Sequence, residues 1–110
     1  MGKKKNKSST IAADFARYFG ENKLENWQRL CRDIGIHQEL PSITRCRKVL
    51  KSVHVNIFDL LDAVRQGTTP QRFQNSYLLA QYSVASNKIF PKRFAKDDGG
   101  PVKVLLRLFF

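Results

Sequence analysis

Apolar side chains recur at spacings of three and four residues along most of the chain, which is typical of helices that bury one face. The clearest run has its apolar positions at Leu24, Trp27, Leu30, Cys31 and Ile34. Gly35 follows this run directly and predicts the end of the helix. Asn22 and Glu25, three residues apart, resemble a capping box that would begin it.

The same pattern predicts further helical segments over residues 11–19, 42–53, 56–66, 76–86, 91–96 and 102–109. Ser42 and Asn56 stand where their side chains would cap two of these helices. Gly20 and Gly67 stand where two helices would end. For the last segment a strand is the competing interpretation, because it is rich in Val and Phe.

These elements predict an all-α fold, a compact single-domain bundle of about six short helices that pack at oblique angles. We expect the helical domain to span residues 11–110. Residues 1–10, MGKKKNKSST, are basic and polar with nothing to bury, so we expect them to be a disordered tail. No uncharged apolar stretch approaches the roughly 18 residues of a membrane span, so no transmembrane segment is expected.

The balance of charge is strongly basic, with 20 Lys and Arg against 9 Asp and Glu in 110 residues, a net charge of +11. Without the four lysines of the tail, the body still carries +7. An apolar content of 42% is too high for a wholly disordered chain. The length is too short for two ordinary domains or for a large enzyme scaffold.

Cations gather on one face of the helix expected from Ser42. Opposite its apolar stripe lie Thr44, Arg45, Arg47, Lys48 and Lys51. No acidic residue occurs between Glu39 and Asp59, so these like charges repel one another, and the phosphates of a nucleic acid would relieve that repulsion. We therefore predict that this face binds DNA, RNA or a ribonucleoprotein, an acidic protein surface being another partner of suitable charge.

Residues 30–47 resemble a helix-turn-helix, in which a first helix ends at a glycine turn and the second enters the major groove. Ser42, Thr44, Arg45 and Lys48 would then face the bases. The connection over residues 36–41 is longer than the three or four residues of the motif. This difference favours two ordinary packed helices with an exposed basic face.

Two further basic clusters are present. Lys92 and Arg93 lie between Phe90 and Phe94, which are more typical of core side chains than of a base-stacking platform. In the tail, Lys3, Lys4, Lys5 and Lys7 would add unspecific electrostatic attraction or serve as a nuclear-import signal.

The rival hypothesis is a protein–protein adaptor. Leu108, Phe109 and Phe110 end the chain and are hard to bury together in a small domain. An exposed apolar patch there would bind a partner or a second copy, which makes a homo-oligomer possible.

Catalytic and cofactor signatures are missing from the sequence. His37 and His54 are not spaced as metal ligands, and Cys31 and Cys46 form no CxxC motif. Asp59 and Asp62 lie three residues apart and could form a carboxylate dyad, but they are expected on a solvated helix face with Arg65 nearby. We therefore expect a non-enzymatic protein without metal, cofactor or small-molecule substrate. The lack of a signal peptide and two buried free thiols indicate an intracellular location, cytoplasmic or nuclear.

Three segments carry a resemblance to other proteins: NWQRLCRDIG (26–35), VNIFDLLDAV (55–64) and GPVKVLLRLFF (100–110). With them the chain resembles small uncharacterised proteins of filamentous fungi. The resemblance implies a single compact domain behind a lysine-rich tail, and it implies no particular activity.

Overall fold

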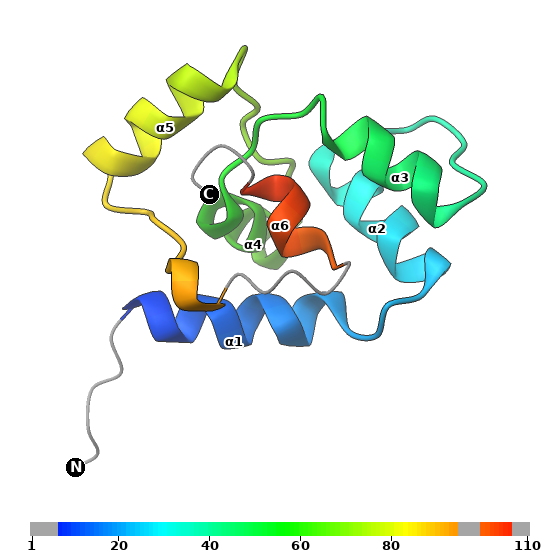
Figure 1. The fold of residues 1–110 in the computed structure, drawn as a ribbon, viewed down its shortest axis with the longest axis horizontal. Coiled ribbons are helices and arrows are strands. Elements are labelled where there is room, and N and C mark those ends of the chain that lie inside the picture. The colour runs from blue at the N-terminus through cyan, green and yellow to red at the C-terminus, as the bar shows by residue number, and fades with distance from the viewer. Residues whose placement is uncertain (1–6, 95–99, 107–110) are drawn as a thin grey trace.

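Helices account for most of the described chain (Figure 1). They are α1 (Lys7–Phe19), α2 (Leu24–Ile34), α3 (Ile43–Leu50), α4 (Ile57–Gln66), α5 (Ser76–Ala85) and α6 (Pro101–Leu105), with a 3-10 turn, η1 (Lys92–Phe94), before α6. The structure is a computed structural model that describes residues 7–94 and 100–106. Within these residues β-structure is limited to one isolated antiparallel bridge between Val55 and Arg72. The predicted all-α bundle is confirmed.

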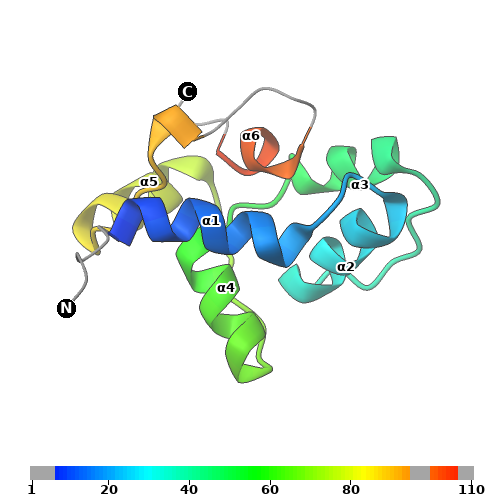
Figure 2. The same cartoon turned by 90° about the horizontal axis from the view of Figure 1, so that it is seen from below.

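The core is built around α2. Its side chains Trp27, Leu30, Cys31 and Ile34 are fully buried. α2 packs against α3, α1 and α4, while α1 also packs on α4 and α3 on α6. In both views α1 lies across the bundle, with α2 and α3 at one end of the long axis and α5 and η1 at the other (Figures 1 and 2).

Local sequence signals fix several helix ends as predicted. The Ser42 hydroxyl accepts a hydrogen bond from the Arg45 backbone N–H at 3.2 Å and so caps α3. The Asn56 side chain accepts one from the Asp59 N–H at 3.2 Å and caps α4. Gly35 ends α2 at φ +102°, in the left-handed region that glycine adopts without steric cost.

The start of α1 differs from the expectation. The helix begins at Lys7, so residues 7–10 belong to it rather than to the predicted tail. Residues without apolar side chains extend a helix readily once it is nucleated, because each one adds a backbone hydrogen bond. The rest of the predicted tail, residues 1–6, lies outside the described residues.

The predicted capping box of α2 is wrong. The N-cap is Lys23, whose side chain makes no capping hydrogen bond. Asn22 instead accepts a hydrogen bond from the indole N–H of Trp27 at 2.7 Å. A buried indole N–H without a hydrogen-bond partner costs free energy. Water can satisfy the exposed backbone N–H groups at the start of α2 in place of a side-chain cap, so the hydrogen bond to Trp27 is the more favourable use of the Asn22 side chain.

The structure also settles the end of α3 and the secondary structure of the last predicted segment. α3 ends at Leu50 rather than at Val53, and the Ser52 hydroxyl donates to the Val49 carbonyl oxygen at 2.7 Å in the turn that follows. Such a side-chain contact competes with continuation of the helix. The segment that begins at Pro101 is a helix and not a strand as far as Leu105.

No helix within residues 7–94 and 100–106 combines the length and the apolar character that crossing a bilayer requires.

Leu60→Ala should lower the free energy of unfolding by about 2–5 kcal/mol, because the Leu60 side chain is fully buried and its removal leaves a cavity. Val64→Ala on the same helix is the matched control, since Val64 is 36% exposed. It should change the free energy by less than about 1 kcal/mol. Chemical denaturation followed by circular dichroism measures both, and equal losses would contradict the orientation of α4.

Candidate nucleic-acid interface

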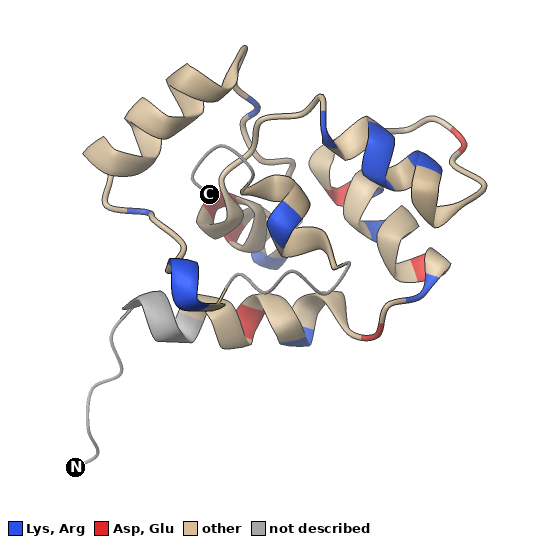
Figure 3. Ribbon diagram, viewed as in Figure 1, with Lys and Arg blue, Asp and Glu red and all other residues tan. Residues whose placement is uncertain are grey.

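The predicted basic face lies on the outer side of α3. Cys46 and Leu50 point into the core, which fixes the helix on α2 and α6. The side chains left exposed on this helix and its C-cap are Thr44, Arg45, Lys48 and Lys51. Figure 3 shows basic residues on α3 at the end of the molecule that lies farthest from η1. Four of the five residues predicted for this helix are therefore accessible to a partner.

Arg47 is the exception on this helix. Its guanidinium lies 5.1 Å from the ring centroid of Trp27, and its side chain is half-buried. A cation above an indole face is held by the negative charge of the ring's π system. Arg47 therefore holds α3 against α2, a packing role that the spacing of the cations did not reveal.

Acidic side chains are engaged elsewhere on the molecule. The ion pairs are Asp14 with Arg17 and Arg65, Glu21 with Lys23, Asp59 with Lys88, and Asp62 with Arg65. Within the described part of the chain, neither Arg45 nor Lys48 forms an ion pair. The positive charges of Arg45 and Lys48 are thus not neutralised by an ion pair with any carboxylate in residues 7–94 and 100–106.

Lys92 and Arg93 do not join this face. Both are exposed on η1, at the opposite end of the long axis from α3 (Figures 1 and 3). The Arg93 guanidinium lies 4.7 Å from the ring centroid of Phe94, and Phe90 is buried in the core. This confirms the packing interpretation of the two phenylalanines.

Most of the other predicted site residues lie outside the described part of the chain. Lys3, Lys4 and Lys5 lie outside the described residues, as do Leu108, Phe109 and Phe110. Lys7 is the first residue of α1.

The connection between α2 and α3 spans residues 35–42. This length is about twice the turn of a helix-turn-helix, so the connection differs from that of the motif. In the described residues the aromatic ring with most exposure belongs to Tyr77, on α5. The α3 face therefore offers cations and hydroxyls for phosphates, and it offers no ring on which a base could stack.

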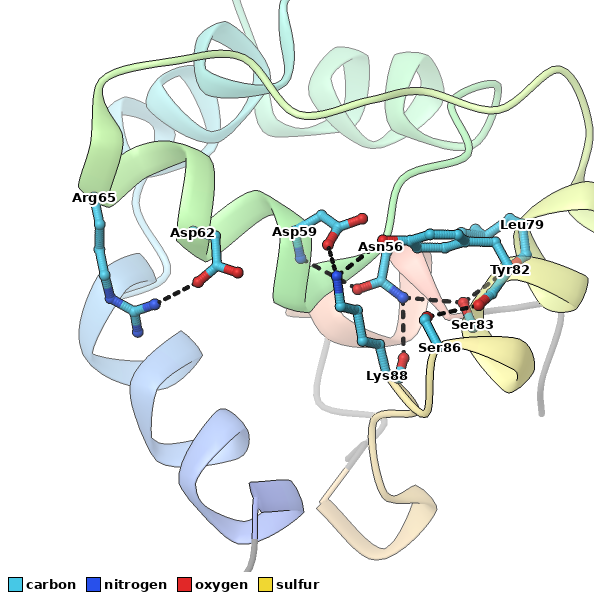
Figure 4. Close-up of polar contacts among 9 residues, drawn as sticks. All are labelled: Asn56, Asp59, Asp62, Arg65, Leu79, Tyr82, Ser83, Ser86 and Lys88. Atoms are coloured by element: carbon cyan, nitrogen blue, oxygen red, sulfur yellow. Dashed lines mark hydrogen bonds and ion pairs between the residues drawn. The ribbon is translucent and has the colours of Figure 1, made fainter.

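A second polar cluster, which the sequence did not reveal, joins α4 to the end of α5 (Figure 4). The ammonium of Lys88 donates to Asp59 at 2.7 Å and to the Tyr82 hydroxyl at 2.9 Å. Asn56 donates to the Ser83 hydroxyl and to the Lys88 carbonyl oxygen, both at 3.0 Å. The expectation of a solvated face fits Asp62 and fails for Asp59, whose partner is 29 residues away in sequence.

The chemistry of this cluster is structural. The hydrogen bonds from Lys88 to Asp59 and Tyr82 raise the pKa of the Lys88 ammonium above its ordinary value. An amine that stays protonated is not a nucleophile or a base. Hydrogen bonds from Asn56, Ser83 and Lys88 connect α4, α5 and the residues that follow α5, so the contribution of the cluster is to hold α5 in place.

The two cysteines lie together in the core. Cys31 and Cys46 are free thiols with no exposed surface, and they lie close enough to influence each other's pKa. Burial raises the pKa of Cys31 to about 12 and also raises the pKa of Cys46. Across the residues that the structure describes, no three His, Cys, Asp or Glu side chains are grouped as metal ligands.

Neither thiol of the native protein should react with the disulfide reagent DTNB at about pH 8. Reaction needs an exposed thiolate, and Cys31 and Cys46 are both buried and protonated. Both should react once the chain is unfolded in guanidinium chloride. Absorbance of the released reagent measures this, and rapid labelling of the folded protein would contradict the burial of the pair.

Stability should fall as the solution becomes alkaline. Burial, followed by the hydrogen bond to Asp33, raises the pKa of Tyr18, and the pKa values of Cys31 and Lys88 are also raised. In the unfolded chain these groups lose their protons at their ordinary pKa values, which are 9.0 for Cys31, 10.0 for Tyr18 and 10.5 for Lys88. The folded protein keeps the same protons to higher pH. More protons bound in the folded state means that the free energy of unfolding decreases with rising pH.

Denaturation curves between about pH 7 and pH 11 should show this decrease beginning near pH 9. Tyr18→Phe removes one contributing group and should make the decrease above pH 10.0 shallower. Tyr77→Phe, at an exposed position, is the matched control and should keep the wild-type profile. A free energy of unfolding that stays constant through this range would contradict the raised pKa values of these groups in the folded protein.

Comparison of the chain with protein-family models, with curated proteins and with solved structures finds no match. Function is therefore inferred from the residues of this chain alone.

Proposed function

We propose that this protein binds double-stranded nucleic acid through the outer face of α3, with Arg45, Lys48 and Lys51 contacting backbone phosphates. The observation that carries the proposal is the distribution of charge. Arg45 and Lys48 are exposed and pair with no acid within the described residues, whereas the acids of α1 and α4 are engaged by other cations. Phosphates are the ligands that would neutralise such a face.

The shape of the face favours a duplex over a single strand. α3 is an eight-residue helix, and an α-helix with its side chains is about 10–12 Å across, similar to the width of the major groove of B-DNA. Single-strand binding relies on exposed aromatic rings, and α3 carries none. Contacts to phosphates alone are independent of base sequence, so we expect binding that depends on salt and hardly on sequence.

The contacts of α3 with the core support the same proposal. Arg47 on the Trp27 ring and the buried Cys46 and Leu50 hold the helix, so its outer cations are presented by a rigid element. A rigid scaffold loses less conformational entropy on binding than a disordered segment does. The basic residues Lys92 and Arg93, at the other end of the molecule, would add attraction at long range.

The double substitution Arg45→Ala and Lys48→Ala should weaken binding to labelled duplex DNA and duplex RNA, measured by fluorescence anisotropy at several salt concentrations. The slope of log K against log salt should become shallower by about 0.9 for each phosphate that the variant no longer neutralises. Lys23→Ala removes an exposed cation that is paired with Glu21, so it is the matched control and should keep the wild-type slope.

The tail is tested separately with Lys3, Lys4 and Lys5 changed together to Ala. Binding that disappears in this variant and survives in the α3 double variant would assign nucleic-acid binding to the tail. No binding to either duplex at low salt would overturn the proposal and leave an acidic protein as the partner of this face.

A further inference from the structure

A pocket of about 380 Å³ lies beside the C-terminal end of α3. Four of the residues that line it are polar: Gln38, Ser52, His54 and Arg72. The others are apolar, and no Asp or Glu is among the described residues of its lining. The volume is typical of small-ligand sites and leaves room for a phosphate group together with the sugar that carries it.

Contacts between backbone segments shape this pocket. Val55 and Arg72 form the isolated antiparallel bridge, and the Phe73 N–H donates to the His54 carbonyl oxygen at 2.8 Å. The chain that follows α3 therefore runs beside the chain between α4 and α5 (Figure 1). This pairing brings Arg72 and Phe73 to a pocket whose other residues come from α3, from the turn after it and from the connection between α2 and α3.

The pocket continues the basic face of α3. Arg45, Lys48 and Ser52 are spaced three and four residues apart, so they follow one side of the helix into the turn after it. Ser52 lines the pocket, and Arg72 is the cation of the same lining. A row of phosphates that lies along Arg45 and Lys48 would therefore reach Arg72 next.

Arg72 is accessible to an anion. Its side chain is exposed, and within residues 7–94 and 100–106 it forms no ion pair. The guanidinium group carries five N–H donors in a planar arrangement that matches two oxygens of a phosphate. The side chains of Gln38 and His54 bring further N–H donors to the same pocket.

The carbonyl groups at the C-terminal end of α3 would oppose an anion if they were unpaired, because they carry partial negative charge. The chain itself engages these groups. The Val49 carbonyl oxygen accepts from both the N–H and the hydroxyl of Ser52, and the Leu50 carbonyl oxygen accepts from the Val53 N–H. The charge of Arg72 therefore determines the sign of the potential in the pocket.

From these observations we infer that the pocket at Arg72 binds a phosphate group, with the Arg72 guanidinium as its cation and Gln38 and His54 as further donors. The inference rests on the proposed function of α3 for the source of this phosphate, which is the backbone of a bound duplex. A free phosphate or a phosphate monoester has the same chemistry and is the other source to be tested.

Titration of inorganic phosphate into the full chain at constant ionic strength, followed by two-dimensional amide NMR, tests the site without nucleic acid. The signals of residues 52–54 and 72–73 should shift and saturate. Arg72→Gln should raise the phosphate dissociation constant about five- to tenfold, the effect of losing one charge-assisted contact. Arg72→Lys keeps the charge without the planar set of donors, so it should lose less affinity. Arg93→Gln removes an equal charge from exposed η1 and is the matched control, which should keep the wild-type constant.

Binding of duplex DNA to the same variants, measured by fluorescence anisotropy, identifies the source of the phosphate. If Arg72 contacts a backbone phosphate, Arg72→Gln should make the slope of log K against log salt shallower by about 0.9, and Lys23→Ala should not. Phosphate binding that Arg72→Gln weakens, together with an unchanged slope for the duplex, would assign the pocket to a free phosphate or a monoester.

The two measurements separate this inference from the proposed function. Saturable phosphate binding in the pocket without binding of any duplex would overturn the proposed function and retain the phosphate site. The absence of a saturable shift at residues 52–54 and 72–73, or an equal dissociation constant in Arg72→Gln, would overturn the inference, whether or not a duplex binds to α3.

Discussion

Burial of Trp27 is the constraint on which the arrangement of the first three helices depends. The indole has no exposed surface, and three elements meet on it. The ring of Phe19 from α1 approaches edge-on with a centroid distance of 5.5 Å, and Arg47 from α3 covers a face of the indole. Asn22, in the connection between α1 and α2, satisfies the indole N–H. One side chain of α2 thus fixes both neighbouring helices.

The contact between Trp27 and Arg47 also decides which cations are available to a partner. With Arg47 turned toward α2, and Cys46 and Leu50 in the core, the rotation of α3 about its axis is fixed. Arg45 and Lys48 consequently face away from the bundle. The strength of the proposed phosphate contacts therefore depends on packing in the core, since a helix free to rotate would present an average of its faces.

Sequence reasoning succeeded where the determining contact is local. The caps Ser42 and Asn56 act on backbone groups three residues away, and Gly35 ends α2 through its own backbone conformation. It failed where the partner is remote: Asp59 is engaged by Lys88, 29 residues on, which no periodicity along one helix predicts.

The surface of α5 shows the same limit. Its apolar residues surround the whole helix, so the spacing did not indicate which side would be buried. Leu79 enters the core while Tyr77 and Leu78 remain exposed, and the polar cluster at Asn56 and Lys88 decides this orientation from outside the helix.

The placement of ion pairs explains how a chain with this net charge holds a compact fold. Two carboxylates are used where elements meet: Asp14 joins α1 to Arg65 of α4, and Asp59 joins α4 to Lys88. Cations at these junctions are neutralised locally, and most of the other described cations are exposed, where salt screens them over about 8 Å at physiological ionic strength. A polyanion bound to α3 would replace that screening. The polyanion would prefer the folded state to the unfolded chain because only the folded helix keeps Arg45 and Lys48 on one face. Since the packing of α3 on Trp27 fixes that face, binding of the polyanion and packing of the core would stabilise each other.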